Sequence, residues 1–212
     1  MSTLSPEIHE IKVAGETFRL PIVQLDANTA IAHLMIIDMG IHFGELVGQA
    51  LAQRFAHLKP EIVIGSATLG IPVAIEVSRH LALDRYVILQ KSAKFSLDDA
   101  LSEEVRSITT PLPQRLLLDR KSVSVIEGRR VLVVDDVVTT GSSLAAAIRL
   151  VRRAGGNVIG AGVILTEGHA WRAALGEDAH LIESLDHIPQ FKILGGAALP
   201  IPEHPERQCP NK

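Results

Sequence analysis

The stretch that decides the fold runs from Val131 to Leu144 and reads VLVVDDVVTTGSSL. Its first four residues are Val or Leu, which is typical of a strand buried on both faces of a parallel sheet. Two adjacent carboxylates, Asp135 and Asp136, follow at the carboxyl end of that strand, where open α/β sheets bind their ligands. Hydroxyl side chains around Gly141 come next, and an amphipathic helix pattern follows. This order predicts an α/β domain with a ligand site at one edge of the sheet.

The loop after the acidic pair has the donors that a phosphate monoester needs. A helix start presents unpaired backbone N–H groups and a partial positive charge. Glycine lets the backbone approach phosphate oxygens closely, and hydroxyl groups add further donors. The predicted phosphate-binding residues are Thr139, Thr140, Gly141, Ser142 and Ser143.

Each part of the stretch has a simpler interpretation when it is taken alone. The loop fits a polar turn with a capping serine, and the acidic pair fits a receiver-type site or solvated charges at a strand end. Their combination is harder to explain by chance. The sequence contains no G-x-x-x-x-G-K-[ST] motif, so a P-loop is a poor alternative.

Short apolar runs and helical patterns alternate on both sides of this stretch. The polar segment Ser92–Asp119, which holds Pro111 and Pro113, predicts a loose hairpin. The alternation predicts a mostly parallel sheet flanked by helices. Strands are expected at Glu61–Gly65, Arg85–Leu89, Arg130–Val134 and Val158–Leu165, and helices at Leu46–Leu58, from Gly70, and at Leu144–Val151. Residues 1–212 are expected to form a single domain, with a core of about 31–184 and a small hood of about 1–30 plus 185–212.

The composition fits an ordinary globular domain. The chain has 212 residues, of which 47% are hydrophobic and 21% charged, and its net charge of −3 argues against a nucleic-acid binder with a generally basic surface. The lone Cys209 excludes an intrachain disulfide and a CxxC site. The N-terminus does not have the pattern of a signal peptide, and no apolar run approaches the roughly 20 residues that span a bilayer. We therefore expect a cytoplasmic protein with no membrane partner.

The stretch Val131–Ser143 resembles the signature with which type I phosphoribosyltransferases bind 5-phosphoribosyl-1-pyrophosphate (PRPP). The resemblance implies that the loop Thr139–Ser143 holds the 5-phosphate. It also implies that Asp135 and Asp136 are the central catalytic residues, which contact the ribose hydroxyls directly or through Mg²⁺. The expected activity is transfer of the 5-phosphoribosyl group to a free nucleobase with release of pyrophosphate. A homodimer is also implied.

A second small-residue loop lies after the Glu61–Gly65 strand and resembles the family's pyrophosphate loop. Its predicted contacts are Ala67, Thr68, Leu69 and Gly70, although a simple strand-to-helix turn fits the same residues. Many relatives carry a basic residue at the position of Leu69. Lys91 matches the place of a pyrophosphate-binding lysine, and the polar segment beyond it resembles a lid whose acidic residues, Asp98-Asp99 and Glu103-Glu104, are candidates for a carboxylate near the base.

Similarity over about Val23–Ile188 points to the bacterial xanthine and adenine phosphoribosyltransferases, and therefore to a purine in nucleotide salvage. The candidate base contacts are Asn28, Glu167 and Trp171, although a structural role for Trp171 is the simpler interpretation. Gly168 stands where the xanthine enzymes place a lysine. The histidines show no metal-ligand spacing and are interpreted as ordinary surface or core residues.

Two alternatives remain at the level of the sequence. Gly65–Pro72 resembles the corresponding loop of orotate phosphoribosyltransferases, although the lysine expected at Leu69 is missing. The other alternative is a regulator that binds PRPP without catalysing a reaction. It would need a DNA-binding element, and the roughly 30 residues before the core show no helix-turn-helix pattern or basic cluster.

Overall fold

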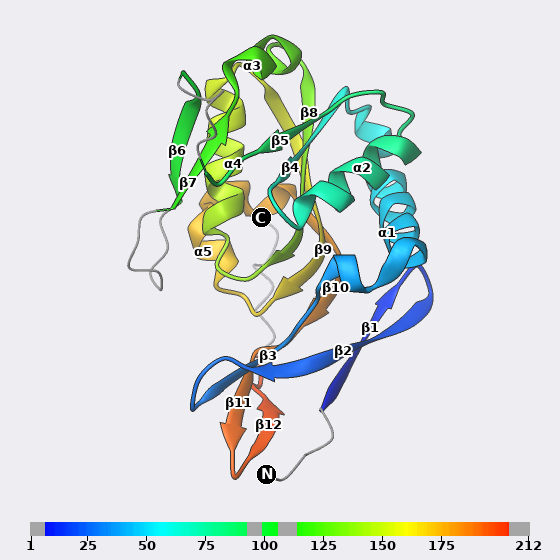
Figure 1. The fold of residues 1–212 in the computed structure, drawn as a ribbon, viewed down its shortest axis with the longest axis vertical. Coiled ribbons are helices and arrows are strands. Elements are labelled where there is room, and N and C mark those ends of the chain that lie inside the picture. The colour runs from blue at the N-terminus through cyan, green and yellow to red at the C-terminus, as the bar shows by residue number, and fades with distance from the viewer. Residues whose placement is uncertain (1–6, 93–98, 106–113, 204–212) are drawn as a thin grey trace, which may run out of the picture.

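The core is a parallel β-sheet of five strands in the order β10-β9-β8-β4-β5 (Figure 1). The computed structural model describes residues 7–92, 99–105 and 114–203. All four neighbouring pairs of this sheet are parallel, which confirms the predicted α/β class. The strands are β4 (Ile62–Ser66), β5 (Tyr86–Leu89), β8 (Arg130–Val138), β9 (Asn157–Glu167) and β10 (Ile182–Ile188).

Helices cover both faces of this sheet (Figure 1). On one face α1 (Gly40–Phe55) and α2 (Gly70–His80) bury Val47, Val73 and Val77 in one hydrophobic cluster. On the other face α4 (Ser142–Arg153) buries Leu144, Ile148 and Val151 in a second cluster. The helices predicted from Gly70 and at Leu144–Val151 are thus confirmed. The remaining helices are α3 (Arg120–Ile126), α5 (Trp171–Leu175) and the 3-10 turns at Ile36–Asp38, Ala56–Leu58 and Gly176–Leu181.

A separate antiparallel sheet from both ends of the chain forms the hood, in the order β1-β2-β3-β11-β12. It lies below the core in Figure 1, past the β9–β10 edge of the parallel sheet. Asp186 of β10 accepts a hydrogen bond from the backbone N of Lys12 in β1 at 2.7 Å, which joins the two sheets. The hood strands are β1 (Ile8–Val13), β2 (Glu16–Gln24), β3 (Thr29–Ala32), β11 (Phe191–Leu194) and β12 (Ala197–Pro200).

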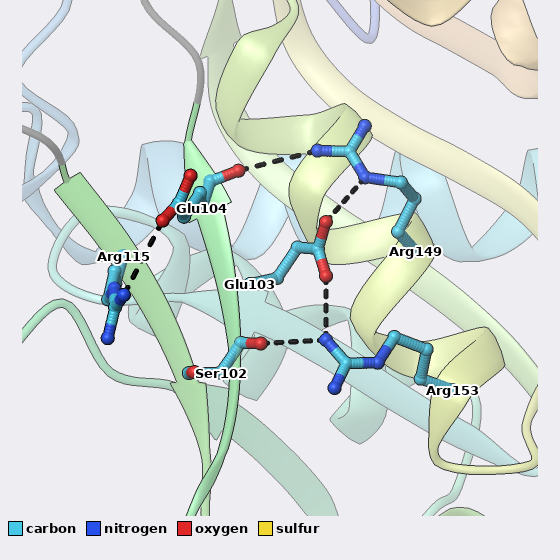
Figure 2. Close-up of polar contacts among 6 residues, drawn as sticks. All are labelled: Ser102, Glu103, Glu104, Arg115, Arg149 and Arg153. Carbon is cyan, nitrogen blue, oxygen red and sulfur yellow. Dashed lines mark hydrogen bonds and ion pairs between the residues drawn. The ribbon is translucent and has the colours of Figure 1, made fainter.

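The predicted hairpin is present as β6 (Leu101–Val105) paired antiparallel with β7 (Gln114–Leu118). Figure 2 shows how it is attached to α4: Glu103 accepts hydrogen bonds from Arg149 and Arg153, both at 2.8 Å. Glu104 pairs with Arg115 at 3.4 Å on the hairpin itself. The Glu103 carboxylate holds the hairpin against the helix and the Glu104 carboxylate pairs within the hairpin, so the expectation that Glu103-Glu104 supplies a carboxylate near the base is wrong.

Strand β8 and helix α1 are longer than the sequence predicted, since α1 begins at Gly40 rather than Leu46. Strand β8 continues to Val138 and therefore includes the acidic pair, because pairing with β9 extends as far as Val138 and Thr166. Helix α3 follows directly after the Ser92–Asp119 segment, where no element was predicted. The side chain of Asp119 accepts a hydrogen bond from the backbone N of Lys121 at 2.9 Å and caps that helix.

Lys94, Asp98 and Cys209 lie outside the described residues. Within the described ranges, no helix is both long and apolar enough to cross a bilayer.

Candidate active site

The acidic pair lies near the carboxyl end of β8, at the edge of the sheet from which α2 and α4 begin. Both carboxylates are only partly exposed. Oδ1 of Asp135 accepts a hydrogen bond from the backbone N of Asp136 at 3.2 Å. The pair therefore forms a concentrated negative charge in a place with little solvent.

That environment raises the pKa of both carboxyl groups. Burial raises the pKa of Asp135 to about 8, and the neighbouring charge of Asp136 adds to the effect. Burial also raises the pKa of Asp136. The positive charge of Lys91 lowers the pKa of both groups, so the structure brings this lysine near the pair. The site is therefore short of positive charge or hydrogen-bond donors, which a ligand can supply.

The predicted phosphate loop lines a cavity of ≈190 Å³ at the start of α4. Gly141 precedes the helix with φ of 76°. A Cβ atom there would lie 2.7 Å from the backbone O of Trp171, so a side chain has neither the backbone conformation nor the space. The cavity is lined by Asp135, Val137, Val138, Thr139, Thr140, Gly141, Ser143 and Leu144. Asp135 and the loop thus line one cavity, and Asp136 is the next residue of β8.

Ser142 is the predicted loop residue that does not line this cavity. Its hydroxyl accepts a hydrogen bond from Thr140 Oγ1 at 3.3 Å, and its backbone N donates to the same Thr140 oxygen at 3.4 Å. Its side chain therefore shapes the loop from within.

Glu167 supports the phosphate loop from β9. Its Oε2 accepts a hydrogen bond from Thr139 Oγ1 at 2.7 Å, while Oε1 is buried and has no hydrogen-bond partner among the described residues. Burial raises the pKa of this carboxyl group. The sequence identified Glu167 as a base contact, whereas the structure shows a further role that positions Thr139.

The second loop, residues 67–70, follows β4 and meets the acidic pair directly. A Cβ atom on Gly70 would lie 2.8 Å from Oδ1 of Asp135, so a glycine at this position lets the two loops approach. The peptide bond between Ala67 and Thr68 is cis. The backbone N–H of Ala67 donates to the carbonyl of Leu89 at 2.9 Å, so the expectation that it offers a pyrophosphate-binding amide is wrong. Leu69 packs against the hydrophobic cluster under α1 and α2.

Trp171 and Asn28 occupy different environments. Trp171 is 5% exposed, its Nε1 donates to the carbonyl of Gly168 at 3.0 Å, and the Arg172 guanidinium lies 4.6 Å from the ring centroid. Its ring is part of the core, so stacking on a base is opposed by the structure. Asn28 lies in the exposed turn between β2 and β3, and its carbonyl accepts a hydrogen bond from Ile193.

Sequence reasoning missed one group of residues at this edge. His169 and His187, interpreted as ordinary histidines, stack with ring centroids 5.2 Å apart and both contact Glu203. The sequence offered a positional signal only for His169, which lies just beyond the predicted Val158–Leu165 strand; His187 lies on β10, inside the segment expected to form the hood.

Comparison with known proteins decides the family. Residues 37–190 match the family described as the phosphoribosyl transferase domain. The chain belongs to the phosphoribosyltransferase family. This confirms the resemblance that the signature around the acidic pair predicted.

Curated phosphoribosyltransferases of two substrate classes resemble the chain. An orotate phosphoribosyltransferase of Caldanaerobacter subterraneus is 33% identical over 124 residues, which are 58% of this chain and 54% of that protein. A xanthine phosphoribosyltransferase of Laribacter hongkongensis is 28% identical over 147 residues, 68% of this chain and 76% of that protein. The chain thus spans about half the length of the orotate relatives that it matches.

A solved adenine phosphoribosyltransferase from Thermoanaerobacter pseudethanolicus shares the fold. It superposes with a TM-score of 0.62 at 20% identity, over 75% of this chain and 88% of that one. The similarity supports the assignment of the core sheet, its helices and the terminal hood to the phosphoribosyltransferase fold.

Proposed function

We propose that this chain transfers the 5-phosphoribosyl group from PRPP to a free nucleobase and releases pyrophosphate. The observation that carries the proposal is one cavity lined both by a glycine-containing hydroxyl loop at a helix start and by Asp135, which Asp136 follows on β8. Hydroxyl and backbone N–H donors suit a phosphate monoester, and carboxylates suit the hydroxyl groups of a ribose. In this proposal residues 1–212 form a single catalytic domain.

The chain's own groups divide the work of binding. Ser143 and the backbone at the start of α4 donate to the 5-phosphate, and Thr139 and Thr140 join them by turning their hydroxyl protons away from Glu167 and Ser142. Asp135 and Asp136 accept hydrogen bonds from the ribose hydroxyls, which relieves the cost of burying them. Lys91 and the amides after Ala67 face the pyrophosphate. Positioning and charge neutralisation then lower the barrier at the anomeric carbon, without a covalent nucleophile.

The donor set of the acidic pair fits Mg²⁺, which prefers carboxylate and phosphate oxygens. The raised pKa values of Asp135 and Asp136 indicate that a cation there would be favourable. Bound Mg²⁺ would neutralise charge on the pyrophosphate group. In that case Asp135 and Asp136 would hold it directly or through water.

A purine is the first candidate for the base, supported by the xanthine relative. Asn28 and the unpartnered Oε1 of Glu167 remain the proposed base contacts. Orotate is the second candidate, favoured by the 33% identity to an orotate enzyme. Leu69, which stands in the place of a basic residue, argues against orotate.

The test is pyrophosphate release from PRPP and Mg²⁺ with adenine, guanine, hypoxanthine, xanthine, uracil and orotate, each in turn. Turnover with a purine supports the whole proposal, whereas turnover with orotate alone replaces the base assignment. If PRPP binds but no base reacts, the chain is a PRPP-binding regulator instead. The Asp135→Asn, Asp136→Asn double variant is the control for contaminating enzymes.

We also propose a cytoplasmic homodimer with no nucleic-acid or membrane partner. Ile41 at the start of α1 is 87% exposed, and Ile37 just before it is 62% exposed, an apolar pair that a second subunit could cover. Light scattering should give twice the mass of one chain, and Ile41→Glu should reduce it to one. A monomeric wild type would contradict this proposal.

A further inference from the structure

Two histidines and a glutamate from separate parts of the chain meet beside the carboxyl edge of the sheet. His187 Nε2 lies 2.7 Å from Glu203 Oε2, and His169 Nε2 lies 3.3 Å from the same oxygen. One nitrogen or oxygen atom from each residue lies within 4.8 Å of the other two. The side chains are 38%, 34% and 26% exposed for His169, His187 and Glu203, so an ion can reach them.

The fold holds these side chains together. His187 lies on β10 directly opposite Thr166 on β9, and His169 follows the end of β9. Glu203 comes after the last hood strand. The backbone N of Ile201 donates to the carbonyl of Gln190 at 2.7 Å, which guides this segment back toward the core. The cluster therefore joins the end of the hood to the sheet.

Hydrogen bonding within the protein leaves the cluster incomplete. Both imidazoles contact one carboxylate oxygen, while Glu203 Oε1 and His169 Nδ1 are buried and have no partner among the described residues. The two rings are stacked, with 6° between their planes. A neutral imidazole offers a lone pair to a metal ion.

We infer that His169, His187 and Glu203 form a binding site for a divalent transition-metal ion of the zinc class, separate from the acidic pair. Two imidazole nitrogens and one carboxylate oxygen are a ligand set of zinc sites, with a water in the fourth position. Tetrahedral zinc at about 2.0–2.2 Å from each ligand places the ligand atoms about 3.4 Å apart. The observed 2.7 and 3.3 Å from Glu203 to the two imidazoles need only a small opening to reach this spacing, and the ligand atoms of all three residues lie within 4.8 Å of one another.

A second layer of contacts is already present on one ligand. His187 Nδ1 lies 2.8 Å from Oγ1 of Thr166, a buried residue. Hydrogen bonds of this kind fix the orientation of a metal-binding imidazole and leave the other nitrogen for the ion. Thr166 is thus a positioning residue. The ion would link Glu203, after the last hood strand, to the carboxyl edge of the core sheet. His169 lies at that edge, two residues after Glu167.

Metal binding to the full-length chain tests the inference. After chelator treatment, Zn²⁺ is titrated in a calorimeter, and Co²⁺ is added separately to read its visible absorption. We expect one Zn²⁺ per chain, a tetrahedral Co²⁺ spectrum, and a Tm about 5–10 °C higher at a zinc concentration 100 times the Kd. Thr166→Val should weaken zinc binding about 10- to 100-fold.

Ligand variants distinguish a metal site from a hydrogen-bonded cluster. Glu203→Gln keeps an acceptor for the imidazoles but loses the charged ligand, so the metal-free protein should stay folded while the zinc-induced Tm shift disappears. His169→Ala should do the same. His80→Ala, an exposed histidine at the end of α2, is the matched control and should bind as the wild type does.

Other metal-binding groups of the chain are tested in parallel. The variants are His204→Ala with Cys209→Ser, and Asp135→Asn with Asp136→Asn. Both should retain the zinc-induced shift. Zinc binding that survives Glu203→Gln and His169→Ala, or that is lost in either of these double variants, would overturn the assignment, as would no binding to the wild type.

Discussion

The two loops that meet at the acidic pair differ in how each can hold an anion. The loop of residues 139–143 lines its own cavity with hydroxyl groups and leads into the twelve-residue helix α4. The loop of residues 67–70 also precedes a helix, but Leu69 packs into the core and the N–H of Ala67 is bonded to Leu89. The first loop is equipped to bind a phosphate by itself. In the proposed function the second loop needs positive charge from Lys91 and a metal ion.

The largest effect is expected from removing the two carboxylates at which both loops meet. Replacing Asp135 and Asp136 by Asn should lower kcat/KM for nucleotide formation about 10³-fold, because charge stabilisation at the transition state is lost. Steady-state kinetics measures the loss. The far-UV circular dichroism should match the wild type, and activity within tenfold of the wild type would remove the central role of the pair.

The loop of residues 139–143 is tested next, with Gly141→Ala. The new Cβ would meet the Trp171 carbonyl at 2.7 Å and force the loop out of shape, so PRPP affinity should fall about 10²-fold through lost charge-assisted hydrogen bonds. Gly128→Ala is the matched control: φ there is also positive, at 72°, but nothing lies within 4 Å of the added Cβ. It should lose stability without losing affinity. Equal affinity losses in both variants would show that backbone strain alone explains the effect.

The loop of residues 67–70 can be given an additional positive charge. Leu69→Lys should bind pyrophosphate roughly tenfold more tightly, because an ammonium group adds one charge-assisted hydrogen bond. The variant should also lose about 1 kcal/mol of stability, since Leu69 packs against the core. Leu69→Met controls for the lost packing. Calorimetry with pyrophosphate and Mg²⁺ measures the change, and unchanged affinity would mean that the loop does not face pyrophosphate.

The smallest expected effect is on the pH dependence of stability, and it comes from the Asp135 carboxyl group between the two loops. Asp135 has a pKa of about 8 in the folded protein against an ordinary 3.8, so the folded state keeps a proton that the unfolded state releases. Stability from this group is present below about pH 4 and is lost as the pH rises toward 8. Asp135→Asn should therefore gain about 3–6 °C in Tm over the wild type at pH 8 without Mg²⁺, and much less at pH 5. The exposed Asp84→Asn is the control, and a pH-independent gain would contradict the raised pKa.

The sequence predicted what lies within one continuous segment. Strand β8, the acidic pair, Gly141 and helix α4 follow one another, and their patterns depend on local burial and backbone conformation. The parallel sheet followed from the same alternation of apolar runs. Lys91 follows β5, the strand next to β4, which brings it to the same edge of the sheet as the acidic pair.

Contacts between separate segments could not be predicted in this way. The bond from Thr139 to Glu167 depends on where β8 and β9 pair, and the meeting of His169 with His187 depends on the pairing of β9 and β10. Glu103 was misassigned because its partners, Arg149 and Arg153, lie on α4, far along the chain. Trp171 had two interpretations, and the packing around Gly141 favours the structural one.

Calorimetric titration of PRPP with Mg²⁺ tests the central claim most directly, namely that the cavity between the acidic pair and α4 holds the phosphorylated ribose. The account predicts one PRPP per chain, with an affinity about 10²-fold higher than that of Gly141→Ala. Gly128→Ala should bind as tightly as the wild type. If PRPP binds the wild type and Gly141→Ala equally, or does not bind at all, the cavity is not the PRPP site.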